Sequence, residues 1–192
     1  MEKRQLILLS LALALVLPAL HGCVPAVVAA GGAAVVMVDD RRSTGTYVED
    51  KTIGSKVSNR INEKYSDEVH VDVIPFNRFV LLVGEAPTQQ IKDDIGVIAL
   101  GVENVRNVQN DISVGPVTST ATRANDAYLT SKVNANFATA GKFDPVHVKV
   151  VTEDSVVYLM GLVTHKEGQD AAEVASTTGG VKKVVKVFEY MD

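Results

Sequence analysis

The chain has 192 residues, 46% of them apolar, and a formal net charge of −4. It can therefore bury a core, which excludes a wholly disordered protein, and it has no extended basic tract of the kind that binds nucleic acid. Because Cys23 is the only cysteine, no internal disulfide can form.

The first 22 residues have the three-part layout of a secretory signal. Two basic residues are followed by a leucine-rich run, and small or turn-prone residues precede Cys23. The run is short for a membrane span and is broken by Pro18. Residues 1–22 are therefore predicted to be a signal peptide that is absent from the mature fold.

Residues 20–23, Leu-His-Gly-Cys, resemble a bacterial lipobox. The resemblance implies that the Cys23 thiol takes a diacylglyceryl group and becomes an acylated N-terminus, and two acyl chains already anchor a protein stably. The alternative is an ordinary buried thiol behind an ordinary signal. Val24, where an aspartate would favour inner-membrane retention, points to the periplasmic face of the outer membrane in a Gram-negative cell.

Residues 23–45 are predicted to form the lipid anchor and a linker. Residues 24–38 are an apolar block too short to span a bilayer and interrupted by two glycines. This block lies either near the membrane or as a strap on the folded domain, and the sequence favours neither. Residues 39–46 form a polar linker of balanced charge.

The rest of the chain consists of two copies of one unit, residues 46–115 and 123–192, joined by a stretch rich in Gly, Pro, Ser and Thr. Ordered blocks of sequence align between the copies. They are IGSKV with LTSKV, VHVDV with VHVKV, VLLVGEA with VYLMGLV, and GVENVRNV with GVKKVVKV. Four blocks in the same order indicate a duplication.

Each copy is predicted to fold in the order α-β-β-α-β, which places the protein in the α+β class. In the first copy Ile53, Val57 and Ile61 share one helix face, and residues 69–73 alternate as in a half-buried strand. A hairpin is expected to turn at 75–78 and, in the second copy, at 153–155. The two helices are expected to cover one sheet face and leave the other partly open, with the two copies packed together.

A glycine recurs near the end of the central strand of each copy, at Gly84 and Gly161. We expect both to end that strand where the chain turns into the second helix. A residue without Cβ there allows a positive φ or close passage of the neighbouring helix.

The order of elements, the VLLVG and MGLVT strand ends and the terminal G-V-x-x-V-x-x-V pattern resemble the BON domain of bacterial envelope proteins. With the lipobox in front, the mature chain resembles the dual-BON outer-membrane lipoproteins associated with division and outer-membrane stress. The resemblance implies two BON domains, no catalysis, no cofactor, and binding of anionic phospholipid by the first helix of the second domain.

No constellation of catalytic or metal-binding residues is apparent. His70 and His147 occupy matching strand positions between valines and are expected on a solvated face, and no His or Cys spacing suits zinc. The pairs Asp93-Asp94 and Glu153-Asp154 are expected on a helix face and in a turn. We therefore predict no metal, no cofactor and no enzymatic activity.

The lipid-binding residues are expected on the helix at 125–138, in the copy that an anionic bilayer repels less. Residues 46–115 hold 7 basic and 11 acidic residues, a charge of −4, whereas 123–192 hold 8 basic and 9 acidic, a charge of −1. Tyr128 stands where the first copy has Thr52 and where the resembling lipoproteins have tryptophan. The predicted lipid-binding set is Tyr128, Leu129, Lys132, Val133 and Asn136. The alternative is that Tyr128 caps the core edge and Lys132 is only solvated.

Two functions follow from these observations. The first is a lipid-anchored envelope protein that binds anionic phospholipid and supports outer-membrane integrity at the division site. The alternative is a protein–protein adaptor for envelope machinery such as outer-membrane barrel assembly, which would use an open sheet face or a strand edge. Neither a nucleic-acid partner nor a periplasmic hydrolase activity is expected.

Overall fold

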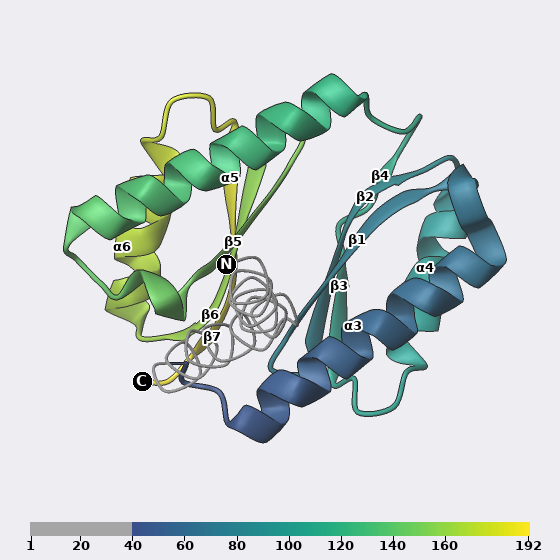
Figure 1. Cartoon of the computed structure of the whole chain (residues 1–192), viewed down its shortest axis with the longest axis horizontal. Helices are drawn as coiled ribbons and strands as arrows, with labels where there is room; N and C mark the ends of the chain where they lie inside the picture. The colour runs from purple at the N-terminus through teal and green to yellow at the C-terminus, as the bar shows by residue number, and fades with distance from the viewer. Residues whose placement is uncertain (1–39) are drawn as a thin grey trace, which may run out of the picture. The chain divides into compact units, whose positions relative to one another are not determined.

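The computed structural model describes residues 40–192, in which the α-β-β-α-β unit occurs twice as the sequence predicts (Figure 1). The signal peptide, Cys23 and residues 24–38 lie outside the described residues. The first unit comprises α3 (Thr44–Tyr65), η2 (Ser66–Glu68), β1 (His70–Phe76), β2 (Phe79–Ala86), α4 (Gln89–Leu100), β3 (Asn107–Asn110) and β4 (Ser113–Val114). The second comprises α5 (Thr120–Ala140), η3 (Pro145–His147), β5 (Lys149–Glu153), β6 (Val156–Val163), α6 (His165–Ser176) and β7 (Lys183–Tyr190).

Each unit contains one small mixed sheet. The predicted hairpins are antiparallel pairs, β1 with β2 and β5 with β6, and the last strand of each unit runs parallel to the central strand. The last strand of the first unit, expected as one strand from the α-β-β-α-β order, is instead divided into β3 and β4. Asp111 and Ile112 separate them. The amide of Ile112 donates to the side chain of Asn110, the last residue of β3, and that side chain in turn donates to Lys92 O.

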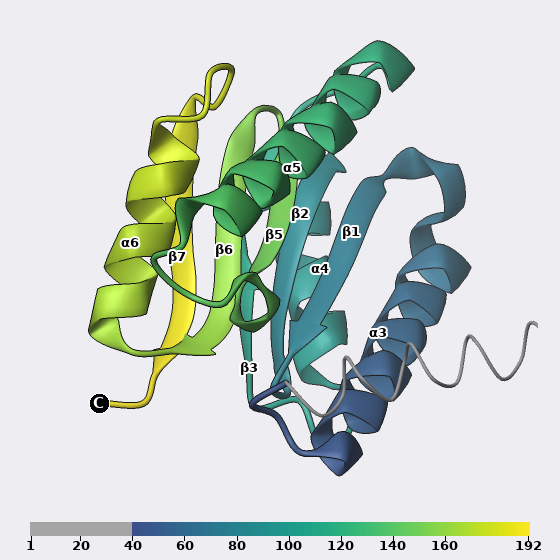
Figure 2. The same ribbon diagram turned by 60° about the vertical axis from the view of Figure 1, so that its left-hand side comes forward.

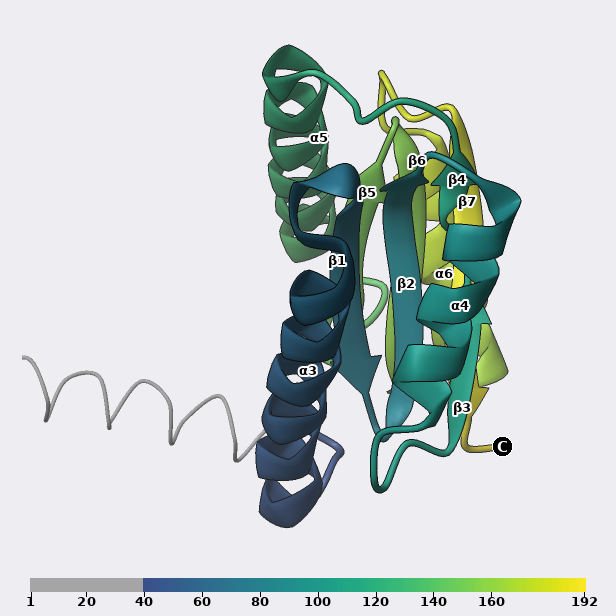
Figure 3. The ribbon, with the colours of Figure 1, turned by 90° about the vertical axis from the view of Figure 1, so that its right-hand side faces the viewer.

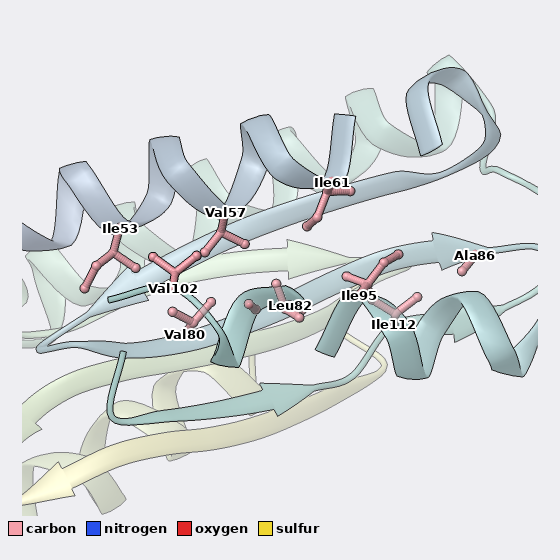
Figure 4. Close-up of a cluster of buried hydrophobic side chains, with 10 residues drawn as sticks. Ile53, Val57, Ile61, Val80, Leu82, Ala86, Ile95, Val102 and Ile112 are labelled. Atoms are coloured by element: carbon pink, nitrogen blue, oxygen red, sulfur yellow. The ribbon is translucent and has the colours of Figure 1, made fainter. Parts of the chain in front are cut away.

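The two helices of each unit cover one face of its sheet, as Figure 3 shows for α3 and α4. The predicted stripe Ile53, Val57 and Ile61 packs with Val80 and Leu82 of β2 in the first core (Figure 4). A second core of the same kind lies under α5 and α6. Each repeat therefore has a core of its own, and none of the helices in 40–192 is long and apolar enough to cross a membrane.

The second face of each sheet is not open, which corrects the expectation from the sequence. Alternate residues of β2, Leu81 and Val83, point away from the helices and form a third buried cluster with Tyr158 and Met160 of β6. The face that would be apolar and exposed in one repeat alone is thus covered by the other. The two copies pack together, as expected from the small size of each unit.

The structural reason for a glycine at this position in both repeats differs from the one expected. β2 continues past Gly84 to Ala86, and β6 continues past Gly161 to Val163, so neither glycine ends its strand. A Cβ on Gly84 would lie 2.1 Å from the carbonyl oxygen of His70, and one on Gly161 would lie 2.3 Å from that of His147. The close neighbour is the backbone of the preceding segment and not a helix. Gly84 also has φ +119°, which disfavours a side chain.

A buried aspartate on the first helix holds the hairpin turn of each repeat. Asn77 and Arg78 both have positive φ, and their amides donate to the Asp50 carboxylate at 2.7 Å each. In the second repeat the Asp126 carboxylate accepts from the corresponding two amides at 3.0 and 2.8 Å. Two consecutive positive φ values are typical of tight hairpin turns, in which these amides need partners.

The polar stretch before α3 is tied to both repeats and is not a free linker. The Arg41 guanidinium donates to both oxygens of Glu167 on α6 at 2.8 Å and to the carbonyl of Leu162 at 2.9 Å. Arg42 pairs with Asp40 and with Asp50, and Ser43 caps α3. The described chain therefore begins with a segment fixed on the folded unit.

Candidate functional site

The helix predicted to contact lipid is α5, which runs across the sheet of the second repeat (Figure 2). The Ser119 hydroxyl accepts from the amide of Thr122 at its start, and Gly141 ends it in a left-handed conformation. Leu129, Val133 and Phe137 recur at four-residue spacing and are buried. This spacing fixes which residues of α5 face solvent.

The five predicted lipid-binding residues divide into two groups. Tyr128 is 63% exposed, the most exposed aromatic residue of the described chain. Leu129 and Val133 are buried in the second repeat and cannot meet a lipid in this conformation, because the hydrophobic stripe that suggested them faces the sheet. Both side chains pack α5 on its sheet, so Tyr128 and its polar neighbours are the part of the predicted set that solvent can reach.

Lys132 and Asn136 lie at the edge of α5, against the loop that follows α6. The Lys132 ammonium donates to the carbonyl of Gly179 at 2.8 Å, and the Asn136 amide donates to the hydroxyl of Thr178 at 2.8 Å. A Cβ on Gly180, whose φ is +106°, would lie 2.7 Å from Leu129 Cδ2. The loop therefore packs closely on α5 and positions the lysine one turn from Tyr128.

The corresponding lysines of the two repeats differ in their partners. Lys56 of α3 lies 3.8 Å from the Glu103 carboxylate, which partly neutralises it. The partner of Lys132 is a neutral carbonyl, and within residues 40–192 no carboxylate lies within ion-pair distance of it. Between the two first helices the sequence pointed only to the aromatic residue as a difference, whereas the structure adds the absence of an ion-pair partner for Lys132 within residues 40–192.

A group of ionisable side chains that the sequence analysis did not bring together lies at the junction of the two repeats. His70 of β1 and Glu85 of β2 face each other across the hairpin, with His70 Nδ1 3.4 Å from Glu85 Oε2. Glu153 of β5 brings its carboxylate to the same place, and ligand atoms of the three residues all lie within 4.8 Å of one another. The His70 side chain is 22% exposed, so it does not lie on the solvated face that the sequence suggested.

Both carboxylates of this cluster are buried, with Glu85 5% and Glu153 8% exposed. Burial, and then the charge of Glu85, raise the pKa of Glu153 to about 8. The sequence pattern placed Glu153 in a turn, but it is the last residue of β5, and the turn begins at Asp154. The available signal was Glu85 itself, a charged residue within an otherwise apolar central strand.

Comparison with known proteins identifies the repeats. The BON domain family matches residues 49–116 and 125–192. The chain is 38% identical over 175 residues to the outer membrane lipoprotein DolP of Haemophilus influenzae, covering 90% of this chain and 91% of the relative. It is 30% identical to a 21 kDa hemolysin of Actinobacillus pleuropneumoniae, covering 79% of each protein.

A third relative is the osmotically-inducible protein Y of Escherichia coli, with 30% identity over 73% of this chain and 72% of the relative. The match to a protein named as an outer membrane lipoprotein extends across nearly the whole chain and agrees with the outer-membrane localisation predicted from the lipobox. The chain therefore belongs to the BON-domain family, as a two-domain outer-membrane lipoprotein related to DolP.

Proposed function

We propose that this protein is a lipid-anchored, non-enzymatic component of the periplasmic face of the outer membrane that binds anionic phospholipid through α5 of its second BON domain. In this role it supports outer-membrane integrity and acts at the division site. The observation that carries the proposal is the exposed ring of Tyr128 one turn from the unneutralised ammonium of Lys132.

This pair suits the boundary between head groups and acyl chains. A tyrosine ring is apolar with a polar tip, which favours the membrane interface, and a lysine keeps its charge among phosphates while its stem lies on apolar surface. Each basic residue close to an anionic surface contributes about 1 kcal/mol. The charge of −1 on residues 123–192, against −4 on 46–115, favours the second domain over the first.

Vesicle flotation tests the proposal with a soluble form that lacks residues 1–23. Wild-type protein is expected to float with vesicles containing phosphatidylglycerol and to float less with purely phosphatidylcholine vesicles. Tyr128→Ala and Lys132→Gln should each reduce flotation several-fold. Thr52→Ala and Lys56→Gln, the matched positions of α3, should leave it unchanged. Equal flotation with both lipid compositions, or none with either, contradicts the proposal.

The predicted anchor is tested separately on the full chain in cells. Metabolic labelling with a palmitate analogue is expected to label the wild-type protein and not Cys23→Ala. Labelling that persists in the variant would place the acyl group elsewhere and overturn the assignment of Cys23.

A protein–protein adaptor is the second candidate function. The sheet faces are covered, so an adaptor that docks through an open sheet face does not fit this fold. What favours an adaptor is a pair of exposed apolar residues one turn apart on α4, Val97 and Leu100, at 69% and 56% exposure. Crosslinking in cells from a photoreactive residue at position 97 should then recover an envelope protein, and recovery of none would count against this function.

A further inference from the structure

The cluster at the junction of the repeats has no part in lipid binding through α5. His70, Glu85 and Glu153 come from three strands, β1, β2 and β5, and thus from both BON domains. Two carboxylates side by side in a buried position repel each other unless a cation or a proton lies between them. The cluster therefore requires either a proton or a cation between the two carboxylates.

Two atoms of the cluster are buried and make no hydrogen bond within the described chain, namely His70 Nδ1 and Glu153 Oε1. Buried polar atoms are rarely left without a partner. Here one atom is an imidazole nitrogen, whose contact with Glu85 Oε2 at 3.4 Å is not a hydrogen bond, and the other is a carboxylate oxygen of Glu153. The three residues bring ligand atoms within 4.8 Å of one another. A nitrogen with two carboxylate groups is a ligand set that divalent transition metals accept.

The third ligand is positioned by the connector between the repeats. Glu85 Oε2 accepts a hydrogen bond from the amide of Thr118 at 3.1 Å and one from its hydroxyl at 3.3 Å. Hydrogen bonds to a ligating carboxylate fix its orientation and are a usual part of metal sites. The connector thus supplies the outer support that a metal-binding Glu85 needs.

The fold does not require these charged residues. In the second repeat Leu162 stands at the position of Glu85, and in the first repeat Phe76 stands at the position of Glu153. Both substitutes are apolar residues in the same backbone setting. His70, Glu85 and Glu153 therefore come together at one end of the pair of sheets, where β1 carries His70 and β5 carries Glu153.

The cluster can be reached from solvent. A cavity of about 340 Å³ is lined by His70 and Glu153, together with Asp72, Asp126 and Arg123. The two aspartates favour entry of a cation, and Arg123 opposes it. The cavity has ample room for a hydrated ion, which needs about 30 Å³ for each water.

We propose that His70, Glu85 and Glu153 form a site for one divalent transition-metal ion, of which Zn²⁺ is the best match, and that the bound ion links the two BON domains. Zinc accepts imidazole nitrogen and carboxylate oxygen at about 2.0–2.2 Å in tetrahedral geometry, with water as a fourth ligand. Small side-chain rotations bring atoms within 4.8 Å of one another to that geometry. Binding would oppose separation of the repeats, because the ligands come from both.

The test is a measurement of Zn²⁺ binding to the full chain, purified in detergent and stripped with a chelator. Equilibrium dialysis with elemental analysis should find one Zn²⁺ per chain, and Zn²⁺ should raise the Tm. Glu153→Gln keeps the size of the side chain and removes its charge, so it remains folded. It should weaken Zn²⁺ affinity at least about 100-fold and abolish the Tm increase.

Three further variants distinguish this site from metal binding elsewhere on the chain. His70→Asn should reproduce the loss, and Thr118→Val, which removes one hydrogen bond to Glu85, should weaken binding about 10-fold. His165→Asn changes an exposed histidine that pairs with Asp192 and should have no effect. Absence of stoichiometric binding by the wild type overturns the proposal. So does wild-type affinity in both Glu153→Gln and His70→Asn, which would indicate a surface site instead.

Discussion

The two BON repeats have the same fold but share only some of their polar residues. Both keep a glycine under the carbonyl of a histidine and an aspartate over the hairpin turn. They differ where Tyr128 replaces Thr52, and where Glu85 of the first repeat is matched by Leu162 of the second. The shared glycines and aspartates satisfy the backbone, whereas Tyr128 and Glu85, each found in one repeat alone, distinguish the two candidate sites.

The largest expected effect is on a shared residue, Gly84. In Gly84→Ala the Cβ would meet the His70 carbonyl at 2.1 Å with φ at +119°, so we expect a loss of about 4 kcal/mol of unfolding free energy. Gly161→Ala should cost less, about 2–3 kcal/mol, because only the close approach disfavours it. Urea denaturation measures both. Gly115→Ala, with open space around it, is the control and should be neutral.

The next effect distinguishes the two hairpin aspartates. Asp50→Ala and Asp126→Ala each leave two turn amides without an acceptor, at a cost of about 2 kcal/mol. Asp50 also accepts from Arg42 at 2.8 Å, so its removal should cost about 1 kcal/mol more. In thermal unfolding, the Tm of Asp50→Ala should be lower than that of Asp126→Ala. The reverse order would mean that Arg42 adds nothing to the first repeat.

A smaller effect concerns the residue that differs between the first helices. The double variant Thr52→Tyr with Tyr128→Thr keeps the composition and moves the aromatic ring to α3. Loss of the ring from α5 should reduce binding to phosphatidylglycerol vesicles by about 1–2 kcal/mol, roughly ten-fold. Lys56 beside Glu103 should prevent α3 from restoring it. Unchanged flotation would show that position 128 does not distinguish the repeats.

The smallest expected effect is the part of the pH dependence that comes from Glu167 of the second repeat. Hydrogen bonds from Arg41 lower the pKa of Glu167, the third residue of α6, to about 2. The third residue of α4 in the first repeat is Ile91, which has no ionisable group. Because the folded-state pKa is depressed, this stabilisation is present above about pH 4.5 and is lost as the pH falls toward 2. Glu167→Gln should remove at most about 1 kcal/mol of stability at pH 7 and flatten the decline of Tm in that range. Glu173→Gln, an exposed partner of Lys142, should leave the decline unchanged.

The sequence was sufficient to predict features that depend on local periodicity. The stripe of Ile53 and Val57, the hairpins and the alternation of β2 follow from periodicity, and the duplication made each repeat a check on the other. The exposure of Tyr128 follows in the same way from its place beside the buried Leu129. These features depend only on neighbours along the chain.

The features that the sequence could not predict all involve residues far apart in the chain. Glu153 was assigned to a turn because nothing in its own segment reveals that β5 lies beside Glu85 and His70. Arg41 was assigned to a linker because its partner, Glu167, is 126 residues away. The carbonyl close to Gly84 belongs to His70 of β1, and the sequence does not give the register in which β1 pairs with β2.

The cluster of Leu81, Val83, Tyr158 and Met160 has a practical consequence for dissecting this molecule. Deleting either repeat would expose the hydrophobic sheet face of the remaining repeat to water, and such a surface is prone to aggregation. If a truncated protein failed to float with vesicles or to restore function in cells, the cause could be misfolding. Such a result would not identify the repeat that binds lipid. Single-residue exchange between matched positions keeps that surface shielded.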